Sequence, residues 1–170
     1  MSERDDLIET LARHRGFLLH TAAGLTDEQA RTASTVSTLT IAGLLKHVAD
    51  VEHLWMDFAR RGADAFAWMT RATADVDADQ QQQDTRFMLT DDQTLEVLRD
   101  RWAGIAASTE SVLREADLDA THPLPKAPWF EPGASWSVRR VALHVLAELS
   151  QHAGHADIIR EAIDGQRTMG

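Results

Sequence analysis

The last long segment of the chain, Arg139 to Gly165, reads RRVALHVLAELSQHAGHADIIREAIDG. Its apolar residues recur every three or four positions, as they do along one face of an α-helix. Residues of this face include Val141, Val145 and Leu149. Ser135 or Ser137 is suited to cap the start of the helix, and Gly165 is suited to end it. We therefore predict one helix from about Ser137 to Ile163.

Three earlier segments show the same periodicity. They run from about Asp5 to Gly24, from Thr40 to Arg61 and from Asp91 to Ala116. Thr90, followed three residues later by Gln93, resembles a capping box at the start of the third segment. We find no strand pattern of useful length, so the sequence predicts an all-α four-helix bundle that forms one domain over residues 1–170.

Two irregular links connect these helices. Residues 63–89 contain a polar run at 77–84, which we expect to be a solvated loop. Residues 117–136 carry all 4 prolines, a density that forbids helix and favours an extended crossover. Trp129 and Phe130 would be costly to leave in water, and we expect them to fold back over the bundle.

The composition excludes several classes of function. A formal net charge of -10 argues against nucleic acid and anionic membranes, because phosphate groups are bound by clusters of Lys and Arg. No run of about 18 apolar residues could span a membrane, and the first residues do not resemble a secretory signal. The sequence therefore predicts a cytoplasmic protein. With 0 cysteines, any catalytic thiol must come from a substrate or cofactor.

The spacing of the histidines indicates a metal site. Glu148 and His152 are one helical turn apart on the same face, so both can reach one ion, and His155 follows three residues later. A catalytic site needs about three protein ligands with one open position. His47 is the best third candidate, because it lies among the inward residues of the Thr40–Arg61 segment. Imidazole ligands favour zinc, nickel, iron or another first-row ion over calcium or magnesium.

Alternatives stay open at this point. A histidine on an apolar helix face is usually a hydrogen-bonded packing residue, so a metal-free bundle is one of them. His144 lies near the face of Glu148 and His152 and is either a packing residue or a neighbour of the ligands. His155 or Asp50 could orient a ligand through a hydrogen bond. Gly154 costs the helix about 1 kcal/mol relative to Ala, so we expect a helix or a ligand to approach it.

Two segments carry a resemblance to a known family. Leu44 to Trp55, LLKHVADVEHLW, resembles the second-helix motif of the DinB-like superfamily. The segment from Arg139 to Gly165 is similar to the last helix of that superfamily, in a branch common in actinobacteria. The similarity extends over nearly the whole chain. It implies a four-helix bundle with a long crossover and a metal bound by three side chains.

The resemblance also implies a ligand set. Carried over to this chain, the ligands are His47, Glu148 and His152. Many members have His where this chain has Glu148, whereas the mycothiol-dependent maleylpyruvate isomerases have Glu there. His155 departs from the family pattern of a non-ligand at its position, so a replacement for Glu148 and a fourth ligand both stay open.

Members with known chemistry use low-molecular-weight thiols. The resemblance therefore implies an S-transferase or isomerase that combines mycothiol with an electrophilic substrate at a divalent ion, zinc or nickel. The alternative hypothesis is a noncatalytic metal-binding or stress-associated bundle. A homodimer stays open as the assembly.

Overall fold

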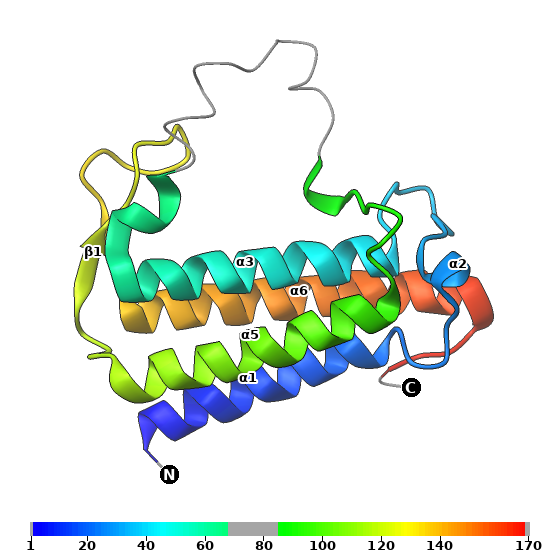
Figure 1. The fold of residues 1–170 in the computed structure, drawn as a ribbon, viewed down its shortest axis with the longest axis horizontal. Helices are drawn as coiled ribbons and strands as arrows, with labels where there is room; N and C mark the ends of the chain where they lie inside the picture. The colour runs from blue at the N-terminus through cyan, green and yellow to red at the C-terminus, as the bar shows by residue number, and fades with distance from the viewer. Residues whose placement is uncertain (1, 68–84, 169–170) are drawn as a thin grey trace.

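The computed structural model describes residues 2–67 and 85–168, which form mainly four long helices (Figure 1). The long helices are α1 (Glu3–His20), α3 (Ile41–Arg61), α5 (Leu95–Glu115) and α6 (Val138–Asp164). Short elements are α2 (Asp27–Ala30), the 3-10 helices η1 (Gly62–Phe66) and η3 (Thr85–Phe87), and strands β1 (Thr121–Pro123) and β2 (Ser135–Ser137). The predicted polar loop at 77–84 lies outside the described residues.

The four helices form a closed ring of contacts. Helix α1 packs on α6, α6 packs on α3, α3 packs on α5, and α5 packs back on α1. Leucine side chains from α1 and α3 fill the centre together with Trp102 of α5, whose indole N–H donates to the backbone oxygen of Leu45 at 3.1 Å. The predicted all-α four-helix bundle is confirmed. Among the described residues, no helix is long and apolar enough to cross a membrane.

Capping residues fix where the helices that carry the site begin. The Thr40 hydroxyl accepts the N–H of Gly43 at 3.0 Å and starts α3. The Ser137 hydroxyl accepts the N–H of Arg140 at 3.1 Å and starts α6. Gly165, with φ 78°, ends α6 in the left-handed region that favours glycine. These boundaries agree with the sequence prediction to within one residue.

The predicted start of α5 was wrong by one turn. The side chain of Gln93 does accept the N–H of Thr90 at 3.0 Å, but the chain makes a turn there. Thr94 is the actual cap, with its hydroxyl accepting the N–H of Val97 at 3.3 Å. Asp27 accepts the N–H of Leu95 at 2.6 Å, so a contact from a distant part of the chain fixes the start of the helix.

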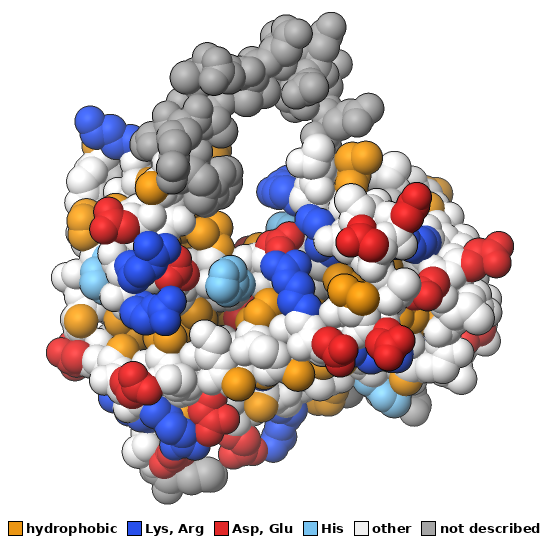
Figure 2. All heavy atoms as spheres, viewed as in Figure 1, with side chains coloured by type: hydrophobic (Ala, Val, Ile, Leu, Met, Phe, Trp, Pro, Cys, Tyr) orange, Lys and Arg blue, Asp and Glu red, His pale blue; other side chains and the backbone are white. Residues whose placement is uncertain are grey.

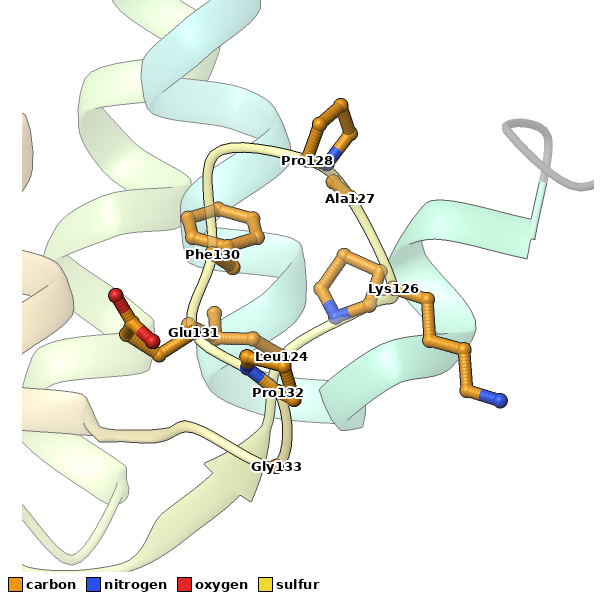
Figure 3. A pocket seen from close by; sticks show the side chains of 9 residues that line it. Leu124, Lys126, Ala127, Pro128, Phe130, Glu131, Pro132 and Gly133 are labelled. Atoms are coloured by element: carbon orange, nitrogen blue, oxygen red, sulfur yellow. The ribbon is translucent and has the colours of Figure 1, made fainter.

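The proline-rich link forms a hairpin. Strands β1 and β2 are antiparallel, with Thr121 opposite Ser137. The loop between them curls around a hollow into which the Phe130, Leu124 and Pro132 side chains point (Figure 3). Phe130 is half-buried and packs near Trp55, as expected, whereas Trp129 is 68% exposed, so the expectation that both rings cover the bundle was wrong for Trp129.

Candidate metal centre

His47 is held on the inner face of α3 and is only 7% exposed. The backbone oxygen of Phe87 comes so close to α3 that a Cβ at Gly43 would lie 2.6 Å from it. Glycine at this position therefore allows η3 to lie directly on α3. This packing brings the Phe87 ring to a centroid distance of 4.3 Å from the His47 imidazole and covers one side of it.

Helix α6 presents the other two side chains. Glu148 and His152 lie one turn apart, with His152 Nε2 3.3 Å from Glu148 Oε2. The His152 ring meets the His47 ring edge-on, at a centroid distance of 5.1 Å. One ligand atom from each of the three residues lies within 4.8 Å of the other two. We call His47, Glu148 and His152 the triad.

The local environment favours the metal-binding protonation states. Burial lowers the pKa of His47 below its ordinary value, and the nearby His152 and Arg86 lower it further. The hydrogen bond from His152 lowers the pKa of the Glu148 carboxyl. Near neutral pH the triad therefore contains a neutral imidazole at His47 and an ionised carboxylate at Glu148, which are the forms that bind a metal.

The donor set fits a divalent first-row ion. Two imidazole nitrogens and one carboxylate oxygen suit zinc, nickel or iron, and ligands of a tetrahedral ion lie roughly 3.4 Å apart. Small side-chain rotations would bring the three ligand atoms, which lie within 4.8 Å of one another, onto one ion. Three protein ligands leave a coordination position for a further molecule, as in catalytic rather than structural sites.

Comparison with known proteins identifies the family. The model of the mycothiol-S-transferase family matches residues 6–165, nearly the whole chain. The chain belongs to the mycothiol-S-transferase family. A search of curated proteins finds no match. A solved structure described as a conserved protein from Enterococcus faecalis has a TM-score of 0.66 and 17% identity, covering 98% of this chain and 99% of that one, and it supports the fold alone.

Of the other histidines that the sequence singled out, His155 lies beside the triad of this transferase-family chain. Its Nδ1 is 3.3 Å from Nδ1 of His152, on the side of that ring opposite Nε2. Among the described residues, the group whose ligand atoms converge consists of the triad without His155. Whether His155 binds the metal stays a prediction. Asp50 is engaged elsewhere, in ion pairs with Lys46 at 3.0 Å and with Arg101.

His144 forms the wall on the other side of Glu148. Its Nε2 lies 3.8 Å from Glu148 Oε1, and its ring lies against Trp55 and Trp136 at centroid distances of 4.7 and 5.2 Å. Burial lowers the pKa of His144. Sequence reasoning left His144 open as a packing residue or a neighbour of the ligands, and the structure shows both kinds of contact, whereas Phe87 and Trp136 were missed. The available signal for Trp136 was its position directly before the helix cap Ser137, at the start of the helix that carries two of the three triad residues.

The face of the molecule that Figure 2 presents is of mixed charge. On this face, basic and histidine side chains lie near one another, with acidic and hydrophobic side chains interspersed around them. This pattern suits a small polar substrate better than an extended polyanion.

Proposed function

We propose that this chain is a metal-dependent enzyme that transfers mycothiol to an electrophilic small molecule. The observation that carries the proposal is the triad, three convergent ligands with one position to spare, in a chain of the mycothiol-S-transferase family. When bound, a divalent ion would stabilise the thiolate of mycothiol and lower the pKa of its thiol. The chain contributes no thiol of its own, since it has 0 cysteines.

The residues of the chain hold and shield the site. His47 and His152 donate imidazole nitrogens from two packed helices, so their separation is fixed by the contact of α3 with α6. Glu148 supplies the negative charge that partly balances a divalent cation. Phe87 on one side and His144 with Trp136 on the other exclude water, which strengthens electrostatic interactions within the site.

The overall reaction is a substitution or an addition. The thiol loses its proton, a bond forms from sulfur to the electrophilic carbon, and a leaving group departs with its bonding pair. Where the substrate is an activated alkene, the π electrons move onto carbon and that carbon takes up a proton instead.

The proposal extends to the metal, the location and the assembly. Zinc or nickel is the ion that we propose, because imidazole ligands suit both. We also propose a cytoplasmic location, because mycothiol is a small intracellular thiol. We treat residues 1–170 as one functional domain and a homodimer as its assembly, which light scattering of the purified protein would test.

A thiol conjugation assay tests the reaction. Monochlorobimane is offered to the metal-loaded protein with mycothiol, bacillithiol or glutathione, and chloride is the leaving group. We expect metal-dependent conjugation with mycothiol that is lost in His152→Ala and retained in His53→Ala, a matched change at an exposed histidine of α3. A folded, metal-loaded protein that conjugates no thiol to any electrophile would favour the noncatalytic metal-binding bundle.

A further inference from the structure

Helix α6 carries more than the metal ligands on the side that faces the site. Four polar side chains occupy successive turns, each four residues after the last: Arg140, His144, Glu148 and His152. Residues at this spacing are neighbours on a helix surface. Arg140 and Glu148 are two turns apart, which is about 12 Å along the helix axis. Arg140 therefore lies on the same side of α6 as Glu148 and His152, two turns before Glu148.

An unbroken wall joins the carboxylate of the triad to this arginine. His144 lies 3.8 Å from Glu148 and edge-on to Trp136, and Trp136 stacks on Trp55 at a centroid distance of 4.8 Å and an angle of 17°. The guanidinium carbon of Arg140 lies 4.7 Å from the centroid of the Trp136 ring. A planar or apolar group could lie along this wall, with its two ends at the triad and at Arg140.

Arg140 differs from most other arginines of the chain because, among the described residues, no carboxylate forms an ion pair with it. Nine arginines form ion pairs with carboxylates: Arg13, Arg15, Arg60, Arg61, Arg101, Arg114, Arg139, Arg160 and Arg167. Arg140 is exposed, and within residues 2–67 and 85–168 it contacts the Trp136 ring without an ion pair to any carboxylate. A guanidinium on an aromatic face keeps its N–H edges available, and its planar fork matches a carboxylate.

We infer that Arg140 is a substrate-recognition residue that binds a carboxylate of the electrophile, with the reactive carbon of that electrophile lying at the triad. This inference rests on the proposed function and adds the class of substrate: an electrophile with a carboxylate on the order of 10 Å from its reactive carbon. Trp136 positions the guanidinium by holding it against the ring, and the middle of the substrate lies along Trp136 and His144.

A matched pair of electrophiles tests the inference. 6-Maleimidohexanoic acid carries a carboxylate at the required distance, and its methyl ester is neutral. In both, sulfur bonds to one alkene carbon, and the other carbon takes up a proton in place of the one that the thiol lost. With mycothiol, we expect kcat/KM of the wild type to favour the acid about tenfold, since a charge-assisted pair at an exposed site contributes on that order.

Substitutions of Arg140 then test whether this residue causes the preference for the acid over the ester. In Arg140→Gln the acid-to-ester ratio of kcat/KM should fall to about one, whereas Arg140→Lys should keep part of the ratio. Arg13→Gln, at an exposed position of α1, should leave the ratio unchanged. A structural role of Arg140 would lower all rates together. An unchanged acid preference in Arg140→Gln would overturn the inference and leave the proposed function standing.

A binding arm separates the inference from the proposed reaction. The saturated, unreactive analogue 6-succinimidohexanoic acid is titrated into metal-loaded protein by calorimetry. If no thiol is transferred to any electrophile, the proposed function fails, and the inference is decided by this arm alone. An affinity that is about tenfold weaker in Arg140→Gln than in wild type supports a carboxylate site at Arg140, and equal affinities overturn it.

Discussion

Two polar clusters inside the bundle share helix α3 but are satisfied in different ways. Glu52 is completely buried, and Arg15 of α1 contacts it with two nitrogens, Nε at 3.3 Å and a terminal nitrogen at 2.5 Å. The hydroxyl of Thr109 on α5 donates to the same carboxylate at 2.6 Å. This cluster is closed, because its charges and hydrogen-bonding groups are matched by partners on three helices.

The triad takes His47 from the same helix and its other two residues from α6, and it is open. His47 precedes Glu52 by five residues, and it meets another imidazole and a carboxylate. In the part of the chain that the structure describes, the ion pairs of Glu148 are with His144 and His152, and neither an arginine nor a lysine closes the cluster. Burying nitrogen and oxygen atoms whose lone pairs have no partner is costly in free energy unless a ligand such as a metal ion binds them. The comparison teaches that the closed cluster is complete without a ligand, whereas the open one has the arrangement of a candidate metal site.

The largest effect is expected at the open cluster. His47→Ala or His152→Ala should remove most of the divalent metal that copurifies with the protein, because two side chains cannot complete the site. Elemental analysis after purification without chelator measures the metal content, about one ion per chain in the wild type. His53→Ala is the control and should keep its metal. Full occupancy in both ligand variants would show that the triad is not the metal site.

The closed cluster should respond in stability and not in metal content. Glu52→Ala leaves the Arg15 guanidinium buried without its partner, and we expect the free energy of unfolding to fall by about 3–5 kcal/mol. Urea denaturation of the metal-free protein measures this change. Replacing the whole cluster, as in Arg15→Met with Glu52→Leu and Thr109→Val, should restore most of the loss, since well-packed apolar groups often replace a buried ion pair without net cost.

An exposed carboxylate provides the matched control for Glu52. Glu9 pairs with Arg13 on the surface of α1, with half of its side chain accessible. Glu9→Ala should change the free energy of unfolding by less than about 1 kcal/mol, because surface ion pairs contribute little. A loss as large as that of Glu52→Ala would mean that burial does not explain the difference between the two carboxylates.

His155 should affect metal affinity less than the triad does. We expect His152 to bind through Nε2, donating its Nδ1–H to Nδ1 of His155 and thereby keeping its orientation. Loss of such an orienting partner typically weakens metal binding 10- to 100-fold. Metal titration of His155→Ala against exposed His20→Ala measures the change, and His155→Asn, which can still accept the bond, should recover part of it. Complete loss of metal in His155→Ala would instead make His155 a ligand.

The stability of the metal-free protein should also depend on pH. Burial lowers the pKa of His47 and of His144 in the folded state, so the unfolded chain binds more protons below pH ~6.5. Unfolding free energy should therefore be flat above that pH and fall as the pH drops toward the folded-state values. Urea denaturation at pH 7.5 and pH ~5.5 tests this, with a His47→Ala and His144→Ala double variant expected to show a smaller fall.

The sequence predicts what depends on local spacing. Thr40 and Ser137 mark helix starts because each hydroxyl caps its own helix, and His47, Glu148 and His152 follow from helical periodicity. Contacts between residues that are far apart in the sequence could not be predicted from local spacing.

The closed cluster and the start of α5 illustrate this limit. Arg15 and Glu52 occupy apolar faces of their helices, which is a signal of pairing, but which charge meets which depends on how α1 packs against α3. The start of α5 was misplaced for the same reason, because Asp27, far away in the sequence, binds its first N–H.

The smallest effect is expected at Gly154, which lies between His152 and His155 on α6. The sequence suggested that something approaches its backbone, yet a Cβ built there meets no described atom within 4 Å, and the residue is exposed. Gly154→Ala should therefore raise the free energy of unfolding by about 0.5–1 kcal/mol, because alanine loses less backbone entropy in a helix. Metal content should not change, since the added methyl group meets no described atom within 4 Å. A variant that is more stable but slower in thiol transfer would mean that a substrate or a second protein uses this gap, and a variant that is less stable would contradict the open surroundings of Gly154.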